Sequence, residues 1–469
     1  MRILGLHIQT PYLLFGAAEA LVLLACPYLV HLIVEFKPAD FDALFPQALT
    51  FSAALSVSMV AMGVHKSRLR EGLAGMMLRT ALAFFLIGAL PLAAFYFFVD
   101  EPSVPPKTLA IWLAFSFVLV GLLRWAASSQ LDQDFLKSRV LVFGSGAKAS
   151  FILTRTRRKT DRSGFVIDGF VDACGTPNLV TALGARTVHL DCSLLEYCIA
   201  HGVHEIAVAV DERRRLTEGE DPLPLDALLD CRLQGVGVID IHRFVERETG
   251  RVEIDLMQPS WVIFSDGFKN GTLRKLAHRL FDVLISFGLL VAAAPVMLLT
   301  ALAIKLEDGL RAPILYRQTR CGRDNRLFEL IKFRSMKPDA EDDGQAVWAQ
   351  QNDPRGTRVG RFIRASRIDE LPQLINILRG EMRFVGPRPE RPEFVAMLNE
   401  KIPYYRLRQL IEPGLTGWAQ VRCAYAASEA DAMTKLQYDL YYMKNRSWLL
   451  DLLIILQTVE VILLGKGAR

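Results

Sequence analysis

The sequence predicts a multi-domain integral membrane protein, with an N-terminal four-helix transmembrane bundle, an α/β Rossmann-like middle domain and a C-terminal α+β domain. Three observations lead to this fold class. The chain has 469 residues, more than one domain needs, and 51% of them are hydrophobic. The apolar residues form long blocks in the first quarter, whereas strand-like runs alternate with helical stretches in the middle and polar motifs crowd the last third. We therefore expect domains at residues 1–130, 138–265 and 270–469.

The charge and cysteine content narrow the classes of partner and compartment. The net charge is +5, and the basic residues concentrate near the apolar blocks and in the last third. This distribution suits an anionic membrane surface or phosphorylated ligands, and we expect no nucleic-acid partner. The seven cysteines are scattered, odd in number and without a C-x-x-C pair, which argues against a disulfide framework and for a reducing compartment. Arg2 is the only lysine or arginine before the first apolar block, and the block lacks a clear small-x-small cleavage site. No removable signal peptide is therefore expected.

Four apolar blocks predict the transmembrane bundle. Each is close to the roughly 20 helical residues that cross a bilayer core. The blocks occupy residues 12–34, 45–64, 78–99 and 108–125. The loops after the first and third blocks are acidic, and those after the second and fourth are basic, so the positive-inside rule places everything after residue 125 in the cytoplasm. The alternative is a soluble helical bundle.

A fifth apolar block, residues 283–304, is flanked by basic residues at both ends. A spanning helix would place residues 305–447 outside the cell, and Pro295 removes a helical hydrogen bond in its middle. Both observations favour a re-entrant helix that breaks at Ala294 and Pro295 and returns to the same face of the membrane. An ordinary kinked spanning helix remains the alternative. The last apolar run, residues 448–464, contains two acids and predicts an interfacial helix, with another span as the alternative.

The middle segment begins with SRVLVFGSGAKA, a short strand followed by the glycine turn Gly144-x-Gly146-x-x-Ala149. Further strand-like runs, GFVIDGFVDA, HEIAVAV and GVGVIDI, alternate with helical stretches and predict a parallel, doubly wound sheet. Asp172 lies near the position of a ribose-binding acid, although its spacing is long. Two interpretations stay open here: a nucleotide-binding domain, and a structural or regulatory sheet that uses the turn only for packing.

The last third is rich in arginine, which binds phosphate oxygens with its planar fork of donors. Convergent arginines therefore predict a polyphosphate ligand, and a solvated or lipid-facing basic surface is the alternative for several of them. Among these arginines stand two neighbouring acids, Asp369 and Glu370, just before Pro372 and an apolar helical stripe. At a helix N-terminus the macrodipole is expected to lower the pKa of both carboxyl groups.

Helix capping would explain one of these acids, but not both. An ionised carboxylate can also attack phosphorus, while its neighbour holds Mg²⁺ against diphosphate oxygens and arginines stabilise the transferred group. The residues alone therefore predict phosphoryl transfer at a membrane surface, with an amphiphilic substrate reached through the helix at residues 283–304.

Five motifs occur in order in this third: KFRSM, RIDELPQL, FVGPRPERPEF, PGLTGWAQVR and KLQYDLYYMKNRS. As a set they resemble the monotopic bacterial phosphoglycosyl transferases, and in particular their large branch, the polyprenyl glycosylphosphotransferases that start exopolysaccharide repeat units. The resemblance covers residues 270–469 and is specific, because several ordered motifs match. The four-helix part and the Rossmann-like (CoA-binding-like) domain match the large-branch layout more loosely.

The resemblance implies a reaction in which a UDP-sugar gives its sugar 1-phosphate to undecaprenyl phosphate, with release of UMP and an aspartyl-phosphate-type intermediate. The family's nucleophile falls on Asp369 and its Mg²⁺-linked acid on Glu370, and both acids form the implied metal site, for Mg²⁺ or for Mn²⁺ in its place. The implied substrate-binding residues are Lys332, Arg334, Arg364 and Arg388.

The resemblance also implies a location in the bacterial inner membrane, among its lipids, with the sheet and catalytic domains in the cytoplasm. The membrane-helix break falls on Ala294 and Pro295, and this chain has Ala294 where family members often have serine. Cys423 and Ala426 replace residues that are commonly aromatic or glycine. A homodimer formed through the four-helix part is compatible with the sequence, and the sugar is not indicated by any residue.

Two other functions are compatible with parts of the sequence. A membrane-tethered NAD-dependent nucleotide-sugar epimerase or dehydratase would use the glycine turn, but no Tyr-x-x-x-Lys pair follows within residues 138–265. A non-catalytic regulator of polysaccharide assembly would leave the acids, arginines and Pro-Gly motifs without a purpose.

Overall fold

The computed structural model resolves two compact units, residues 1–3 with 7–257 and residues 4–6 with 258–469, and each is described by itself. The predicted domain limits are not tested by this division and stay predictions. The residues that the structure describes are 2–3, 6–7, 10–34, 41–62, 72–89, 92, 105–130, 137–155, 162, 164–172, 178–211, 223–257, 272–337, 355–423 and 428–463.

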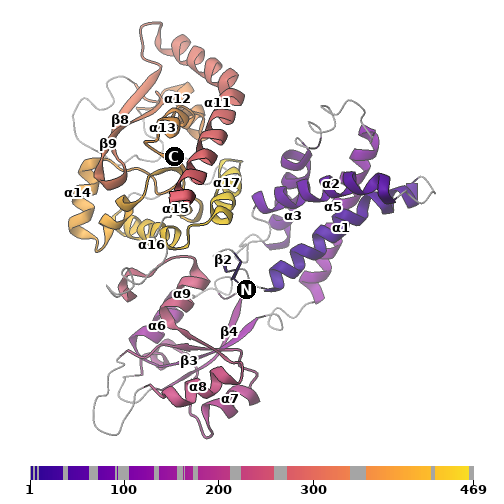
Figure 1. Ribbon diagram of the computed structural model, residues 1–469, viewed down its shortest axis with the longest axis vertical. Coiled ribbons are helices and arrows are strands. Elements are labelled where there is room, and N and C mark those ends of the chain that lie inside the picture. Colours follow the sequence, from indigo (N-terminus) through magenta and orange to yellow (C-terminus); the bar gives the residue numbers. More distant parts are fainter. Residues whose placement is uncertain are drawn as a thin grey trace. The chain divides into compact units, whose positions relative to one another are not determined.

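The N-terminal part is a helical bundle (Figure 1). Its elements are β1 (Arg2–Ile3), β2 (Leu6–His7), α1 (Thr10–Val34), α2 (Phe41–Ala61), α3 (Gly72–Leu82), the π-helical turn η1 (Ala83–Gly88) and α5 (Pro106–Gln130). Helix α1 packs against both α2 and α5. Across the described residues four helical segments are long and apolar enough to cross a membrane: Leu14–Ile33, Leu44–Ala61, Pro106–Ala126 and Lys275–Asp308. Three of them confirm predicted blocks, whereas most of the predicted third block beyond residue 89 lies outside the described residues.

A buried ion pair joins the first and last helices of the bundle. Arg124 on α5 donates to both carboxylate oxygens of Glu19 on α1, at 2.5 and 3.0 Å, and neither side chain is exposed. Arg124 also donates to the hydroxyl of Thr80 on α3. Charged groups in an apolar environment are tolerated when they are paired in this way.

The middle part of the chain forms a five-stranded parallel sheet, as predicted. The strands are β3 (Ser138–Phe143), β4 (Phe165–Val171), β5 (Thr187–Val188), β6 (Glu205–Val208) and β7 (Gly237–Asp240). Their order is β5-β4-β3-β6-β7, so the direction of winding reverses between β3 and β6. The helical elements are α6 (Ala147–Arg155), η3 (Thr181–Leu183), α7 (Leu194–Ala200), α8 (Leu225–Leu233), α9 (Ile241–Thr249) and η4 (Ile254–Leu256).

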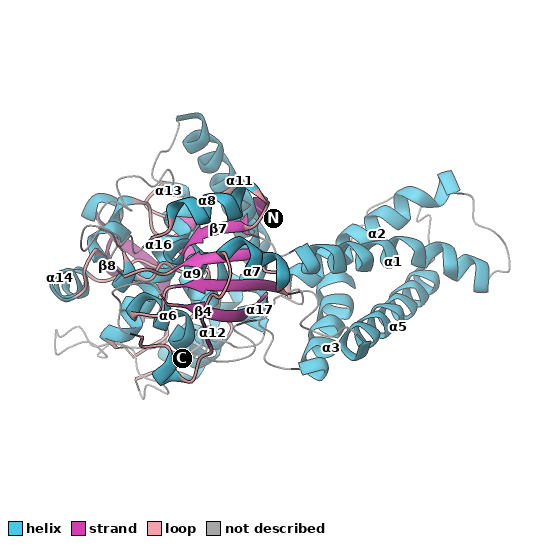
Figure 2. Ribbon diagram, turned by 90° about the horizontal axis from the view of Figure 1, so that it is seen from below, coloured by secondary structure: helices cyan, strands magenta, loops and turns pink. Residues whose placement is uncertain are grey.

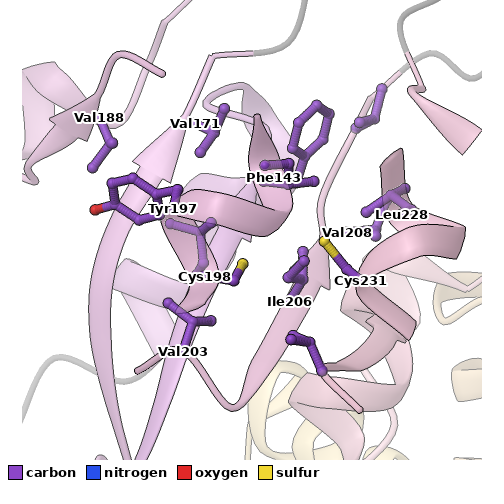
Figure 3. Packing of buried hydrophobic residues seen from close by; sticks show 14 residues of the cluster. Phe143, Val171, Val188, Tyr197, Cys198, Val203, Ile206, Val208, Leu228 and Cys231 are labelled. Atoms are coloured by element: carbon purple, nitrogen blue, oxygen red, sulfur yellow. The ribbon is translucent and has the colours of Figure 1, made fainter. Parts of the chain in front are cut away.

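Two hydrophobic cores cover the two faces of this sheet. In one, residues of α7 and α8 such as Tyr197, Cys198 and Cys231 pack against strand residues such as Ile206 (Figure 3). In the other, α6 and α9 cover the opposite side chains of the same strands. Figure 2 shows the strands in magenta with helices beside them. Because parallel strands need both faces covered, the alternation of strand and helix in the sequence was sufficient to predict this arrangement.

The second unit combines one long helix with small sheets and short helices. Its elements are α11 (Thr272–Asp308), β8 (Leu315–Cys321), η6 (Arg323–Asn325), β9 (Leu327–Phe333), α12 (Arg358–Ala365), η7 (Ile368–Glu370), α13 (Gln373–Arg379), β10 (Arg383–Val385), α14 (Pro392–Lys401), η8 (Tyr405–Leu410), β11 (Gly414–Thr416), α15 (Trp418–Arg422), α16 (Glu429–Asn445) and α17 (Trp448–Leu463). Strands β8 and β9 form an antiparallel hairpin, and β10 pairs with β11 in parallel. This part therefore contains both helices and strands, and its assignment as an α+β domain stays a prediction.

The predicted break of the membrane helix at Ala294 and Pro295 is wrong. The apolar block at 283–304 lies inside a single helix of 37 residues, and the helix is not interrupted at Ala294 or Pro295. Figure 1 shows instead that α11 changes direction along its length. A proline inside a helix removes one backbone hydrogen bond and bends the axis without ending the helix, which accounts for the difference.

Helix α17 confirms the predicted helix at the C-terminal end, but its acids are not at a surface. Asp451 and Glu460 are each only 3% exposed. Asp451 accepts a hydrogen bond of 2.8 Å from the hydroxyl of Tyr442 on α16 and lies 3.5 Å from His278 on α11. These carboxylates therefore pack inside the unit, and the interfacial position of α17 stays a prediction.

Polar contacts attach α11 to the rest of its unit near both of its ends. Asp282 accepts from the Arg383 guanidinium at 2.8 Å and from the Phe384 backbone N–H at 3.3 Å, both on β10. Arg279 donates to the last carbonyl groups of α13 at 2.5 and 2.7 Å. Glu307 accepts from the first two backbone N–H groups of α12 at 2.7 and 2.9 Å. The long apolar helix is thus fixed to the elements that surround the acid pair.

The ion pair in the bundle gives a first testable prediction. Changing Glu19→Ala leaves the Arg124 guanidinium buried without its carboxylate, and the stability of the bundle should fall by roughly 3–5 kcal/mol. Thermal unfolding of the purified protein in detergent measures this loss.

The double variant Glu19→Leu with Arg124→Leu should recover most of the lost stability, because no unpaired charge remains. Asp42→Ala, in the exposed first turn of α2, is the control. If Glu19→Ala melted at the same temperature as this control, the ion pair would not support the bundle.

Candidate active site

The acid pair lies in the short 3-10 turn η7, between α12 and α13. Arg367 precedes the turn in the left-handed backbone conformation, with φ of 59°. Pro372 is the N-cap of α13, which confirms the helix that the sequence predicts after the two acids, and Gly380, with φ of 87°, is its C-cap. A residue other than glycine with positive φ is uncommon, and such residues are found preferentially at functional sites.

Glu370 is held by two arginines. Its Oε1 atom accepts hydrogen bonds from Arg388 at 2.9 Å and from Arg367 at 3.2 Å. Burial opposes ionisation of this carboxyl, but the charges of Arg388 and Arg367 outweigh burial and lower its pKa to about 2. Glu370 is therefore an anion at every physiological pH.

Asp369 has the opposite character. Only 9% of the residue is exposed, and its buried Oδ1 atom accepts no hydrogen bond from any described residue. Burial, together with the negative charge of Glu370, raises its pKa to about 6. The expected lowering of both pKa values by the helix N-terminus is thus wrong for Asp369, because desolvation exceeds the effect of the dipole.

Lys332 brings a positive charge to this pair from strand β9. Its ammonium lies 5.0 Å from the ring centre of Tyr316, and its charge acts on both Asp369 and Glu370. Burial, reinforced by the charge of Arg320, lowers the pKa of the Lys332 amine. Of the predicted site residues, the structure therefore brings together Asp369, Glu370, Lys332 and Arg388.

The structure places the other two predicted substrate-binding residues differently. Arg334 is 5% exposed and donates to Asp308, at the end of α11, at 2.6 Å. Arg364 lies half-buried on α12, and no hydrogen bond or ion pair of the described residues connects it to the acid pair. Their roles in substrate binding stay predictions.

Two residues that the sequence analysis did not single out hold the site together. Arg367 is one, through its bond to Glu370. Asn376 is the other: fully buried on α13, it accepts from the Ile331 N–H at 3.0 Å and donates to the Glu329 carbonyl at 2.7 Å, which fixes β9 beside Lys332. The sequence signal for Asn376 is its position as an amide beside the apolar stripe of the helix predicted after the two acids.

A cavity of about 210 Å³ lies beside Glu370, and Asp369 is not among its lining residues. Its polar lining includes Arg367, Glu370, Arg388, Gln420 and Lys435, and its apolar lining includes Leu289, Phe384, Leu415, Val461 and Ile462. The apolar side chains come partly from α11 and α17, so one cavity presents both fixed charges and a hydrocarbon surface. Such a lining suits a ligand that is itself charged at one part and apolar at another.

The residues present fit a divalent metal that arrives with a phosphorylated substrate. No group of three or more potential metal ligands occurs among the described His, Cys, Asp and Glu residues. The two acids could nevertheless contribute two carboxylates, and Asp369 Oδ1 is a buried oxygen that lacks a hydrogen bond in the described structure. Mg²⁺ is typically held by one or two protein carboxylates together with substrate phosphates. Asp369 and Glu370 provide that number of carboxylates.

The family described as "Bacterial sugar transferase" matches residues 273–465. A UDP-N-acetylgalactosamine-undecaprenyl-phosphate N-acetylgalactosaminephosphotransferase of Aeromonas hydrophila is 41% identical over 242 residues, 52% of this chain and 56% of that protein. An undecaprenyl-phosphate glucose phosphotransferase of Komagataeibacter xylinus is 32% identical over 369 residues, 76% of this chain and 66% of that protein.

A third relative, a UDP-glucose:undecaprenyl-phosphate glucose-1-phosphate transferase of Caulobacter vibrioides, is 43% identical over 195 residues. The match covers 41% of this chain and 72% of that protein. The chain thus spans less than two thirds of the first two relatives and more than two thirds of the third. The similarity to the Komagataeibacter protein extends beyond the family match.

The unequal pKa values of the two acids predict opposite effects on stability. The pKa of Asp369 is higher in the folded protein than its ordinary 3.8, so its ionised form is penalised at neutral pH. Asp369→Asn should raise the free energy of unfolding by roughly 1–3 kcal/mol at about pH 7. The gain should disappear below about pH 4, where Asp369 holds its proton in both states.

Glu370→Gln should instead lower the stability, because the lowered pKa of Glu370 means that its ionised form supports the fold above its ordinary pKa of 4.5. This contribution is lost as the pH falls towards about 2. Thermal unfolding of both variants in detergent across this pH range is the measurement. A shift of the same sign in both would contradict the assigned electrostatics.

Proposed function

The chain belongs to the bacterial sugar transferase family, and we propose that it transfers a sugar 1-phosphate from a UDP-sugar to undecaprenyl phosphate. The products would be undecaprenyl-diphospho-sugar and UMP. The observation that carries the proposal is the cavity in which Glu370, Arg367 and Arg388 share a lining with apolar side chains of α11 and α17. The relatives named above as undecaprenyl-phosphate sugar phosphotransferases use substrates of this amphiphilic kind.

In the first step, an ionised carboxylate oxygen of Asp369 attacks the phosphorus that carries the sugar. A bond forms between that oxygen and phosphorus, and the bond from phosphorus to the bridging oxygen of the diphosphate breaks. The bridging oxygen keeps the electron pair and leaves with UMP. The sugar phosphate is then held on Asp369 as a mixed anhydride.

In the second step, a phosphate oxygen of undecaprenyl phosphate attacks the same phosphorus, and the Asp369 carboxylate leaves. The lipid then carries the sugar through a diphosphate, and the enzyme returns to its starting state. The residue best suited for the attack is Asp369, because its Oδ1 has no hydrogen bond in the described structure, whereas Glu370 is held by two guanidinium groups.

The positive groups around the acids have separate parts in this proposal. Lys332 and Arg388 would bind diphosphate oxygens and offset the negative charge on the leaving UMP. When bound, Mg²⁺ would supply further charge neutralisation of the diphosphate, with Asp369 and Glu370 as its protein ligands. Glu370 also orients Arg388 through their hydrogen bond of 2.9 Å.

We also propose that the protein lies in the bacterial inner membrane, with α11 entering and leaving by the cytoplasmic face. The charge of the loops supports this topology. The internal proline of α11 and the change of direction of this helix in Figure 1 support it as well. Leu284, Leu298 and Leu302 of α11 are exposed and would face lipid acyl chains. The same helix contributes Leu289 to the cavity, which would bring the lipid substrate to the acids.

The central test is UMP release by the purified protein with Mg²⁺, a panel of UDP-sugars and undecaprenyl phosphate. Without the lipid phosphate, release should stop at about one UMP per enzyme molecule, because the first step needs only the donor. Continued release should require the lipid phosphate, and Asp369→Asn should abolish both. With a donor labelled in the sugar-linked phosphate, the wild-type protein should form a hydroxylamine-sensitive phosphoenzyme that Asp369→Asn lacks. The panel also identifies the sugar.

Asp324→Asn, an exposed acid in η6 of the same unit, is the matched control and should release UMP at the wild-type rate. Full turnover by Asp369→Asn would reject the assigned nucleophile. Absence of UMP release with every donor would favour the non-catalytic regulator of polysaccharide assembly. Tight retention of NAD with no UMP release would favour the epimerase or dehydratase.

The raised pKa of Asp369 predicts the pH dependence of the reaction. The nucleophile must be ionised, so kcat/KM should rise with pH up to about 6 and then level off. Below that value it should fall about tenfold for each unit of pH. A profile of UMP release measured from about pH 4.5 to about pH 8 checks this, and a rate that stayed constant to about pH 4.5 would contradict the assigned environment of Asp369.

A further inference from the structure

The glycine turn of the sheet domain lies where a nucleotide phosphate would bind in a doubly wound fold. Gly144, Ser145 and Gly146 connect β3 to α6, and Gly144 has φ of 122°. The winding of the sheet reverses between β3 and β6, and ligands of such folds bind at the carboxyl ends of the strands at this point. Backbone N–H groups at the start of α6 would be the donors to a phosphate.

In this protein those donors already have an anionic partner. Asp211, which follows β6, accepts from the N–H of Ala147 through Oδ2 and from the N–H of Lys148 through Oδ1, each at 2.7 Å. The Lys148 ammonium donates to the carbonyl oxygens of Val210 and Asp211, at 3.0 and 2.7 Å. Lys148, the second residue of α6, thus holds the backbone of the residue that carries the carboxylate.

Gly146 leaves room for this contact, and Gly144 leaves room for the backbone that follows β6. A Cβ atom added to Gly146 would collide with the carboxylate of Asp211, and one added to Gly144 would collide with the Ala209 carbonyl. Gly144, Ser145 and Gly146 are buried, and the Ser145 carbonyl accepts from the N–H groups of Leu179 and Val180 at 2.9 and 3.2 Å. Close approach of backbone to a ligand is the usual reason for such glycines, and here the approaching group belongs to the chain.

We infer that the sheet domain closes its own phosphate-binding turn: the Asp211 carboxylate stands where a nucleotide phosphate would, so the domain holds no dinucleotide there and uses the contact to join β6 to α6. The candidate ribose-binding acid supports this inference, because Asp172 accepts a hydrogen bond of 2.9 Å from Asn178 and so has a structural partner. Of the two interpretations of the glycine turn, this favours the structural one. The inference does not depend on the transferase activity.

The test is amide hydrogen exchange of the full-length protein in phospholipid nanodiscs, followed in peptides that cover residues 144–155. In Asp211→Ala the Ala147 and Lys148 amides lose their acceptor, and their exchange should quicken by roughly tenfold or more. Inorganic pyrophosphate should slow exchange again in Asp211→Ala, because the vacated turn accepts it, and should leave the wild type unchanged. NAD should likewise leave the wild-type turn unchanged.

Two further variants keep the result interpretable. Asp211→Asn retains an acceptor oxygen without the charge and should exchange at a rate between those of the wild type and Asp211→Ala. Asp230→Ala, an exposed acid on α8, is the control and should match the wild type. Unchanged peptides from β7 and α9 show that each variant is folded.

Three outcomes would overturn the inference. One is wild-type exchange in Asp211→Ala, which would mean that the carboxylate does not hold the turn. Another is slowing of wild-type exchange by NAD or pyrophosphate, which would mean that the turn is open to ligands. The third is a quickened Asp211→Ala turn that pyrophosphate does not slow, which would mean that no phosphate site is being filled.

Discussion

The hydrogen bonds from Arg388 and Arg367 to Glu370 are the interaction on which the candidate site depends. Two adjacent carboxylates repel each other, and burial makes both harder to ionise. The guanidinium groups bind Glu370 and overcome this difficulty there, whereas for Asp369 burial and the charge of Glu370 outweigh the positive charges nearby. Glu370 is thereby a permanent anion that orients Arg388, whereas Asp369 has a pKa of about 6. Two neighbouring acids with such different pKa values are typical of active sites in which one acid reacts and the other holds it in place.

Helix α11 is as much a part of this site as it is of the membrane region. Asp282 fixes it to β10, the strand just before Arg388, Arg279 fixes it to the end of α13, and Glu307 fixes it to the start of α12. A lipid substrate that travels along this helix would therefore reach a structure already tied to the helix. The helical bundle is held together by a different contact, the buried ion pair of Glu19 and Arg124. None of the residues assigned to the proposed chemistry lies in α1, α2, α3 or α5.

The same physical solution appears at two helix N-termini in different units. The first N–H groups of a helix need acceptors, and a carboxylate at this end also interacts favourably with the helix dipole. Glu307 of α11 supplies the acceptors for α12, and Asp211 supplies them for α6. In both cases the carboxylate comes from a distant element, so the contact caps one helix and also joins two elements. A helix N-terminus that is already filled in this way is poorly suited to an external phosphate.

The sequence by itself determined the apolar segments, the parallel sheet, the turn before α13 and the set of residues from which the site is drawn, because these follow from hydrophobic periodicity and from the local chemistry of glycine and proline. Only the tertiary structure decided which arginines reach Glu370, that Arg334 pairs with Asp308, and that Asn376 fixes β9. It also showed that α11 continues through Pro295 and that Asp211 fills the glycine turn. The reason is that pairing, burial and pKa depend on neighbours brought from elsewhere in the chain, whereas a local pattern records only the residues that are available for them.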